Sequence, residues 1–441
     1  MKLSPAPITI KENEGFAKND IFKRELFAKS LTNIIKNCDD ELVIAIDAPW
    51  GSGKTTFVKM WRGMLKSDEY KIESIYFDAY RNDFLDDPFL ALVGEIYQLL
   101  DKTNPATKKF KAQAIATLKV ISKVAVNVGL RAVSAGVVDG TALEGAGVGS
   151  EAVTVADKYL ESRIDSVEAD KKLITDFHNT LTKAVEKMAD GKKLIFIIDE
   201  LDRCKPSFAL DLLEKIKHIF STPNIVFVLV MNRKQINEII KLRYGQKAEP
   251  TLYLQKFIHL WAGLPQTLDR FSSNRKIYLN DCLWRMGFKQ NESTNNSAIQ
   301  SFEELIEYYS LTLRDIERSL TNFSILVNLG YNHHHGYALI APYLSIIKVL
   351  YPQIIKSLAV EKISYEELLD DTKLHDLIDR YSECWEPEGH ELRWLLKYYL
   401  ITDNEEFAAF IEQSKQMSIR DRRPANIVKN MCTALETFLE G

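Results

Sequence analysis

Four short apolar segments along the chain have the composition of buried strands, and helical patterns separate them. The segments 42–46, 194–198 and 225–231 are almost entirely aliphatic and aromatic, whereas 72–80 is mixed and ends in polar residues. Continuous apolar segments between helical patterns are typical of parallel strands that are buried on both faces. We therefore predict an α/β fold in which a parallel sheet has helices on both faces.

Helical spacing of apolar residues appears before, between and after these segments. The segment 20–36 precedes the first strand, and its apolar face is expected to pack against the sheet. A further helix is predicted over 87–100, with Pro88 in its first turn. From 266 to 441 every pattern is helical, which predicts an all-α lid or bundle packed on the α/β core.

The segment 102–150, between the second and third predicted strands, is the least regular part of the chain. It begins with lysines, continues with small and β-branched residues, and ends in a glycine-rich stretch. Lys119, Lys123 and Arg131 interrupt its apolar content, and their spacing places them on one face of a helix. A membrane-spanning helix needs roughly 20 mostly apolar residues without charges, so this segment is not predicted to be one.

Three interpretations of that segment stay open. It is a helix packed on its own domain with a flexible glycine-rich connection, a self-association surface, or an amphipathic helix on an anionic membrane. The absence of Trp and Phe between residues 112 and 138 weakens the membrane interpretation.

A charged helical pattern then runs from 151 to 189. The predicted domains are an N-terminal segment with the first part of the core (1–101), a helical insert (102–190), the second part of the core (191–265) and a helical C-terminal domain (266–441).

A glycine-containing loop follows the first strand directly and leads into a helix. Its residues are Ala48, Pro49, Trp50, Gly51, Ser52, Gly53, Lys54, Thr55 and Thr56. A strand, a loop ending in Gly-Lys-Thr and a helix form the context of a phosphate-binding loop, whose backbone N–H groups converge on the β-phosphate. Lys54 then supplies charge to the β- and γ-phosphates, and Thr55 reaches Mg²⁺. Ala48 stands where the pattern has its first glycine, so a positive φ there would strain the loop.

Two acidic residues, Asp199 and Glu200, directly follow the third apolar segment and give it the form of a Walker B strand. A buried parallel strand would bring Asp199 beside Mg²⁺, opposite Thr55 and through a water. Glu200 is then placed to orient or deprotonate the attacking water. An apolar strand before an acidic pair is a weak signal alone, but it becomes specific downstream of a phosphate-binding loop.

Other polar residues at strand ends each have two interpretations. Asn232, after the fourth apolar segment, is a sensor of the γ-phosphate or an ordinary turn residue. Asp78, after the second, is a ligand contact or a helix cap. Arg203 and Arg233 are candidates for an arginine that stabilises the transition state, with a structural salt bridge as the alternative for each.

With these residues the chain resembles KAP-type P-loop NTPases, a branch of the STAND/AAA+-related ASCE ATPases. The matching motifs are Ala48-Pro49-Trp50-Gly51-Ser52-Gly53-Lys54-Thr55, Phe77-Asp78-Ala79-Tyr80-Arg81 and, most specific, Ile198-Asp199-Glu200-Leu201-Asp202-Arg203-Cys204-Lys205-Pro206. Tyr253-Leu254-Gln255-Lys256-Phe257-Ile258, Leu264-Pro265 and Leu313-Arg314-Asp315-Ile316 extend it, so that it covers residues 15–322. The resemblance implies ATP as the nucleotide, Mg²⁺ as cofactor, and an ASCE-type core with an insert between the two Walker motifs.

The resemblance also adds expectations outside the core. Many members carry transmembrane helices in the insert, whereas the charged insert here indicates a soluble or peripheral member. Arg314, on a helix beyond the core, is a candidate second sensor that reaches the γ-phosphate, and the alternative is a salt bridge with Asp315 or Glu317. Ala48 and Glu200 depart from the usual glycine and the frequent aspartate. Some bacterial members are linked to phage exclusion, which makes anti-phage defence a hypothesis for this chain.

Composition limits the partners and the compartment. The formal net charge of −4 over 441 residues gives no overall electrostatic reason to expect nucleic acid, although a local basic site is still compatible with it. The five cysteines form no Cys-x-x-Cys pair, which argues against a disulfide framework and a zinc site and fits a reducing cytoplasm. The N-terminus has prolines and charges where a signal peptide has an apolar core. We expect a cytoplasmic protein, or one peripheral at the inner face of the membrane if 102–150 binds lipid.

The sequence therefore predicts a Mg²⁺-dependent ATPase whose hydrolysis drives a conformational or assembly switch between the core and the helical lid. The expected partners are ATP and either a second copy of the chain or another protein. A nucleotide-gated scaffold or membrane-surface interaction module with little turnover is the alternative.

Overall fold

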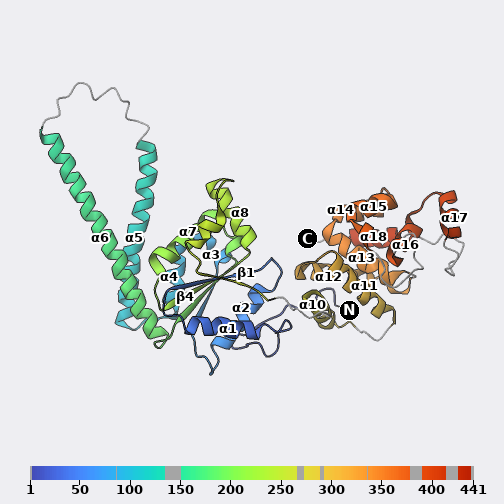
Figure 1. Cartoon of the computed structure of the whole chain (residues 1–441), viewed down its shortest axis with the longest axis horizontal. Helices are drawn as coiled ribbons and strands as arrows, with labels where there is room; N and C mark the ends of the chain where they lie inside the picture. Colours follow the sequence, from blue (N-terminus) through green and yellow to red (C-terminus); the bar gives the residue numbers. More distant parts are fainter. Residues whose placement is uncertain are drawn as a thin grey trace, which may run out of the picture.

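The computed structural model describes residues 2–85, 87–134, 150–265, 273–288, 293–334, 336–377, 390–413 and 426–438. Figure 1 shows a core built around a sheet, a pair of long helices that extend away from it, and a helical unit on the opposite side of the core. The sheet and the helical unit confirm the predicted fold class, an α/β core followed by an all-α C-terminal part.

Five parallel strands form the sheet, in the order β2-β3-β4-β1-β5. Their bounds are β1 Leu42–Asp47, β2 Ser74–Asp78, β3 Leu194–Asp199, β4 Ile225–Met231 and β5 Leu260–Gly263. The register pairs Asp47 with Met231 and Asp78 with Asp199, so the polar residues at the strand ends share one edge of the sheet. Four strands were predicted. The edge strand β5 was missed, because it has only four residues and all of them retain some exposure.

The two faces of the sheet bury different residues of the same strands. In β1, Ile44 and Ile46 face a cluster with helices α1 and α2, whereas Val43 and Ala45 face a larger cluster on the other side. That larger cluster contains side chains of α4, α7 and α8. The helix bounds are α1 Glu25–Lys36, α2 Lys54–Leu65, α4 Pro88–Leu99, α7 Pro206–Lys215 and α8 Arg233–Tyr244. The expected packing of the first helix is confirmed, since its buried residues form one face.

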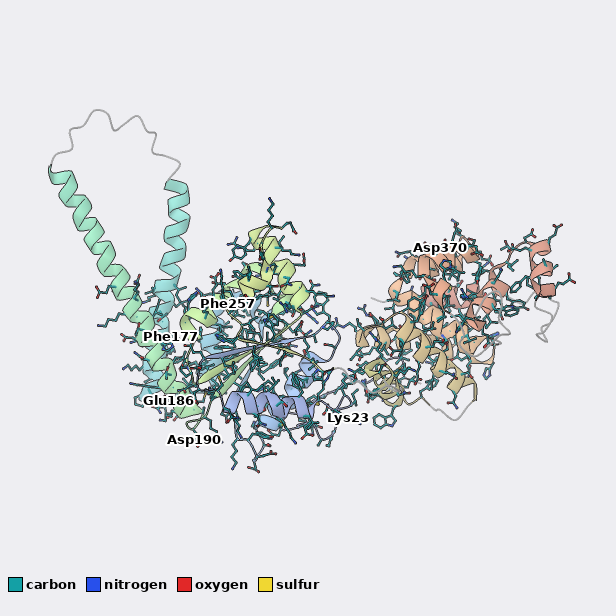
Figure 2. All side chains as sticks on the ribbon, in the orientation of Figure 1. Lys23, Phe177, Glu186, Asp190, Phe257 and Asp370 are labelled. Atoms are coloured by element: carbon teal, nitrogen blue, oxygen red, sulfur yellow. The ribbon has the colours of Figure 1, made fainter. Side chains whose placement is uncertain are left out.

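The chain between β2 and β3 forms the long helix pair of Figure 1, α5 (Pro105–Ser134) and α6 (Ser150–Met188). The base of the pair packs on the core. Phe110 of α5 and Phe177 of α6 are fully buried with ring centroids 5.8 Å apart, and Phe177 also contacts Phe89 and Phe220. Figure 2 shows Phe177 where the helix pair meets the core. This contact supports the interpretation in which the insert packs on its own domain. Residues 135–149 and the side chains of Lys123 and Arg131, on which the membrane and self-association interpretations rest, lie outside the described part.

No helix within the described residues combines the length and the apolar content needed to cross a membrane.

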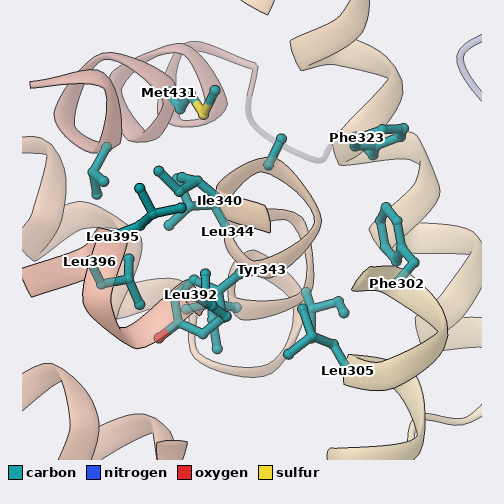
Figure 3. Close-up of a cluster of buried hydrophobic side chains, with 14 of the residues drawn as sticks. Phe302, Leu305, Phe323, Ile340, Tyr343, Leu344, Leu392, Leu395, Leu396 and Met431 are labelled. Carbon is teal, nitrogen blue, oxygen red and sulfur yellow. The ribbon is translucent and has the colours of Figure 1, made fainter. Parts of the chain in front are cut away.

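The C-terminal unit is a helical bundle with its own core. Its helices are α10 Asn274–Arg285, α11 Ser293–Tyr308, α12 Leu313–Asn328, α13 Tyr337–Leu350, α14 Pro352–Ala359, α15 Tyr365–Thr372, α16 Glu391–Leu400, α17 Asn404–Gln413 and α18 Ile427–Thr437. Figure 3 shows the centre of this core, where Phe302 and Phe323 meet edge to face beside Ile340 and Leu344 of α13. Helix α13 ends at Leu350 and α14 begins at Pro352, because proline is tolerated in the first turn of a helix but is unfavourable in its interior.

The N-terminal segment 2–24 joins the two units. Lys2 N–H donates to the carbonyl of Met286, and the hydroxyl of Ser324 donates to the carbonyl of Lys2. Further along, the segment runs against α2, where it leaves no room for a side chain at Gly63. The segment then reaches the loop after β1. The helical bundle is thus connected to the core by this segment as well as by the chain that leaves β5.

Candidate functional site

The loop between β1 and α2 adopts a conformation that requires its glycines. Gly51 has φ +73° and Gly53, the N-cap of α2, has φ +80°. These left-handed values are unfavourable for residues with a Cβ. Ala48 is absent from the described non-glycine residues with positive φ, and its N–H donates to the carbonyl of Met231 at 3.2 Å. Ala48 therefore does not have the positive φ that would have strained the loop, and alanine is tolerated at this position.

Two polar groups of the loop bear on anion binding. The ammonium group of Lys54 donates to the carbonyls of Ala48 at 2.7 Å and Pro49 at 3.1 Å, and burial lowers the pKa of this lysine despite the nearby charges of Asp202 and Asp199. The hydroxyl of Ser52 is buried, and the described part of the chain offers it no hydrogen-bond partner. A buried hydroxyl without a partner is unfavourable. It fits a loop whose donors serve a bound anion.

Asp199, at the end of β3, is the centre of a hydrogen-bond network that joins the two Walker motifs. Its Oδ2 accepts from the hydroxyls of Thr55 at 2.7 Å and Tyr76 at 3.0 Å, and its Oδ1 accepts from the Glu200 N–H at 2.9 Å. Asp199 is almost fully buried, and this burial raises the pKa of its carboxyl although all three hydrogen bonds oppose the shift. A bound divalent cation would favour the ionised form.

Glu200 has a left-handed backbone, with φ +61° and ψ 25°. The turn that follows holds this conformation, because the Glu200 carbonyl accepts from Arg203 N–H at 3.1 Å and from the thiol of Cys204 at 3.6 Å. A non-glycine residue in this region is strained by about 1 kcal/mol or more, and such strain is typical of functional sites. The Leu-Asp-Arg-Cys motif therefore fixes where the Glu200 side chain points.

The Glu200 carboxylate forms an ion pair with Nε of Arg203. Burial and the neighbouring Asp199 raise the pKa of Glu200, whereas the charge of Arg203 opposes this shift. The same turn contacts the phosphate-binding loop, since Trp50 donates its indole N–H to the buried carboxylate of Asp202. Arg203 thus contacts Glu200 from its own turn and lies at the cleft described below.

The remaining strand-end candidates have local partners. Asn232 Oδ1 caps α8 by accepting from Lys234 N–H at 3.1 Å, while the adjacent Met231 carbonyl is bonded to Ala48. Asn232 therefore lies beside the phosphate-binding loop and also serves as a helix cap. Asp78 caps the short helix α3 (Ala79–Asn82), as one of its two interpretations predicted. Arg233 stacks on the ring of Trp261, with its guanidinium carbon 4.5 Å from the ring centroid.

The helical bundle contributes the N-terminus of α12 to the same loop. A Cβ on Gly51 would lie 3.4 Å from the backbone nitrogen of Arg314 and from the Cβ of Thr312. Thr312 and Asp315 form a capping box at this end of the helix. Glu317 accepts a hydrogen bond from the hydroxyl of Tyr278, and within the described residues neither it nor Asp315 forms an ion pair with Arg314. The salt bridge that was the alternative for Arg314 is not formed.

A cleft lies between the phosphate-binding loop, the N-terminal segment and α12. Its wall includes all loop residues from Trp50 to Thr56 together with Glu200 and Arg203, and on the bundle side Tyr278 and Arg314. Ala48 and Pro49 lie at the entry to the loop, outside this lining, and Pro49 contacts the site through its carbonyl.

The family model for the KAP family P-loop domain matches residues 24–329, more than half of the chain. The chain belongs to the KAP family of P-loop NTPases. The resemblance inferred from the Walker motifs and the Leu-Asp-Arg-Cys run is thereby confirmed, and the chain is a member of a nucleotide-binding NTPase family.

Two solved structures of the Aeropyrum pernix ORC2 protein, its ADP form and its ADPNP–ADP complexes, also match the chain. The sequence identities are 11% and 12%, and the matches cover 97% of this chain and 97% and 98% of the ORC2 chains. The TM-score is 0.37 in both cases. Among curated proteins, none matches the chain significantly.

The donor set at this KAP site fits Mg²⁺. Magnesium is usually held by one or two carboxylates and by substrate phosphates, with water completing the shell. Thr55 and Asp199 supply a hydroxyl and a carboxylate that already touch one another. Within the described ranges, no group of three or more histidine, cysteine or acidic residues is arranged to hold a metal alone. A cation here would need phosphate oxygens as further ligands.

Two residues of the site were missed from the sequence. Tyr76 was counted only as part of a strand, although its place between buried Ile75 and Phe77 turns its hydroxyl toward Asp199. The alternation in this strand could have indicated that Tyr76 has a distinct environment. Arg24 was treated as part of the first helix, yet it lines the cleft and contacts the phosphate-binding loop. Its sequence position gives no signal of that contact, because 28 residues separate the two partners.

Proposed function

We propose that this KAP NTPase is a Mg²⁺-dependent ATPase in which hydrolysis changes the contact between the core and the helical bundle. The observation that carries the proposal is the direct hydrogen bonding of the buried Asp199 to Thr55 and Glu200, two residues that line one cleft. Thr55 is in the first turn of α2, whereas Asp199 ends β3. A structural hydrogen-bond network alone does not require that Thr55 and Glu200 line a cleft beside an anion-binding loop.

In this mechanism the loop binds and orients the triphosphate. Backbone N–H groups at the N-terminus of α2 donate to the β-phosphate, and the Lys54 ammonium moves from the Ala48 and Pro49 carbonyls to the β- and γ-phosphates. Ser52 gains a partner for its buried hydroxyl. Thr55 and Asp199 would hold Mg²⁺, which supplies charge neutralisation at the β- and γ-phosphates when bound.

Glu200 acts as the base. Its carboxylate orients a water for attack on the γ-phosphorus and accepts a proton as the bond from the γ-phosphorus to the ADP oxygen breaks, which yields ADP and inorganic phosphate. The raised pKa of Glu200 supports this role, since a stronger base accepts the proton more readily. Arg203 must exchange its ion pair with Glu200 for a contact with the γ-phosphate if it stabilises the transition state.

The contact between Gly51 and the start of α12 supports the proposed switch. Arg314 is in the first turn of this helix and lines the cleft, which supports its role as a sensor of the γ-phosphate. Asn232, which directly follows β4 and is not among the residues that line the cleft, would be the other sensor. Loss of the γ-phosphate would remove an attraction between the helical bundle and the core. The position of α12 would then depend on the nucleotide.

The test is phosphate release from MgATP and MgGTP by the parent chain and by Lys54→Ala. The proposal expects hydrolysis of MgATP, a lower rate with MgGTP, and loss of both activity and nucleotide binding in the variant. An equal rate in Lys54→Ala would overturn the assignment of the site. A higher rate with MgGTP than with MgATP would show that GTP, and not ATP, is the preferred substrate.

A nucleotide-gated scaffold is the second candidate, and the close approach of the start of α12 to Gly51 favours it equally. Light scattering with ATP, with ADP and without nucleotide separates the two. Assembly that needs ATP binding but proceeds unchanged when hydrolysis is blocked supports the scaffold, and ATP-dependent assembly that persists in Lys54→Ala excludes gating by this site.

Anti-phage defence, a cytoplasmic location and lipid contact through 102–150 stay predictions, and vesicle flotation with and without 102–150 tests the last.

A further inference from the structure

Arg24 is a buried cation in the wall of the cleft. Only 2% of its surface is exposed to solvent, and its guanidinium carbon lies 4.6 Å from the centroid of the Phe22 ring. Nη1 donates to the carbonyl of Ser52 at 3.0 Å, and Nε donates to the carbonyl of Pro265 at 3.2 Å. Its own N–H donates to Asp20, which fixes the start of α1. A single side chain therefore joins the phosphate-binding loop to the end of the core, where the chain leaves for the helical bundle.

The hydrogen bond to the Ser52 carbonyl also orients the N–H of the same peptide group, which belongs to Gly53. The C=O and N–H of a trans peptide point in opposite directions. Holding the Ser52 carbonyl toward Arg24 therefore turns the Gly53 N–H away from Arg24. Gly53 is the N-cap of α2, and N–H groups at this position of a phosphate-binding loop are donors to the nucleotide phosphates.

The surroundings of Arg24 keep it in place. The position of a Cβ on Gly53 would be 3.3 Å from Nη1, so the side chain packs closely against the loop. Burial lowers the pKa of Arg24 to about 10, which still leaves it charged at neutral pH. Within the described residues it forms no ion pair with a carboxylate, and its guanidinium contacts carbonyl oxygens instead. A buried cation of this kind is unfavourable unless it stabilises something else.

We propose that Arg24 is a positioning residue that orients the Ser52–Gly53 peptide for binding the β-phosphate and ties this loop to the chain segment at Pro265. The proposal rests on nucleotide binding by the phosphate-binding loop. It concerns the phosphates alone, because the Gly53 N–H would meet the β-phosphate and not the base or the α-phosphate.

Three variants test this role by dissociation constants for MgATP, MgADP and AMP. Arg24→Met removes both donors with little loss of volume, and Arg24→Lys keeps a charge that reaches one carbonyl at most. Arg393→Met is the matched control, since Arg393 also donates to a backbone carbonyl but lies on α16 of the helical bundle and is not among the residues that line the cleft. Thermal unfolding and circular dichroism of each variant report whether the fold is retained.

Arg24→Met is expected to raise the dissociation constants for MgATP and MgADP by the same factor, roughly 10- to 100-fold, because one hydrogen bond to a charged group is lost. AMP lacks a β-phosphate, so its dissociation constant should change by less than about 3-fold on the same reasoning. Arg24→Lys should fall between the parent and Arg24→Met, and Arg393→Met should bind all three nucleotides as the parent does.

Two results would overturn the proposal. Unchanged binding of MgATP in a folded Arg24→Met would remove the role of Arg24 and leave the proposed ATPase function intact. An equal loss for MgATP, MgADP and AMP would show that Arg24 supports the site as a whole and has no specific effect at the β-phosphate. A parent chain that binds no nucleotide would overturn both proposals.

Discussion

The hydroxyl oxygen of Thr55 lies 2.7 Å from Oδ2 of Asp199. This contact joins the first turn of α2 to the end of β3, two strands away from β1 in the sheet. The two groups would share a magnesium ion, so each should influence the cation affinity of the site.

Thr55→Val removes the hydroxyl and keeps the shape of the side chain. We expect the Mg²⁺ concentration for half-maximal phosphate release to rise by about tenfold or more, because one ligand is lost. A Mg²⁺ titration at saturating ATP measures it. Thr433→Val, which removes an exposed hydroxyl on α18, is the control. An unchanged Mg²⁺ dependence in Thr55→Val would exclude Thr55 as a ligand.

Arg203→Met should move the pH dependence of turnover. The positive charge of Arg203 lowers the pKa of Glu200 relative to what burial and Asp199 would produce, so its removal raises that pKa. Glu200 acts as a base only when ionised. The acidic limb of the profile of kcat against pH should therefore shift to higher pH, together with a lower maximal rate if Arg203 also contacts the γ-phosphate. Arg243→Met, an exposed change on α8, should leave the profile in place. A shift to lower pH in Arg203→Met would contradict the assignment.

The N-terminal segment makes a testable contribution to stability at Gly63. A Cβ at this position would lie 2.4 Å from the carbonyl oxygen of Glu14, so Gly63→Ala must displace the segment from α2. We expect the free energy of unfolding to fall by about 1–3 kcal/mol. Gly94→Ala is the matched control, because Gly94 is also within a helix and a Cβ there meets nothing within 4 Å. That control should be neutral or stabilise by up to ~1 kcal/mol.

Urea denaturation of both variants measures the difference. Equal effects at Gly63 and Gly94 would mean that the N-terminal segment does not press on α2 in solution. A loss at Gly63 alone supports the second connection between the core and the helical bundle.

The sequence was sufficient for the elements whose pattern is local. Strands β1, β3 and β4 are continuous apolar segments because helices cover both their faces, and such burial leaves a clear signature. The Walker residues were found for the same reason, since each follows a predictable strand. Strand β5 left no such signature. It has four residues at the edge of the sheet and pairs only with β1 among the described strands.

The contacts that complete the candidate site could not be predicted, because they join residues that are far apart in sequence. Arg24 contacts Ser52 and Pro265, the latter 241 residues away. Arg314 was named as a sensor candidate from its motif alone, whereas the packing of α12 against Gly51 depends on how the whole bundle is placed. Tyr76 is intermediate, since the strand was predicted and only its partner Asp199 was not.

Hydrolysis by Glu200 is the central claim, and the Glu200→Gln variant tests it most directly. The amide keeps the size of the side chain but cannot accept the proton from water. Measured with MgATP, the variant should bind nucleotide within about threefold of the parent, while its turnover falls by about 100-fold or more, the usual contribution of a general base. Turnover at the parent rate in a variant that binds MgATP would contradict the account.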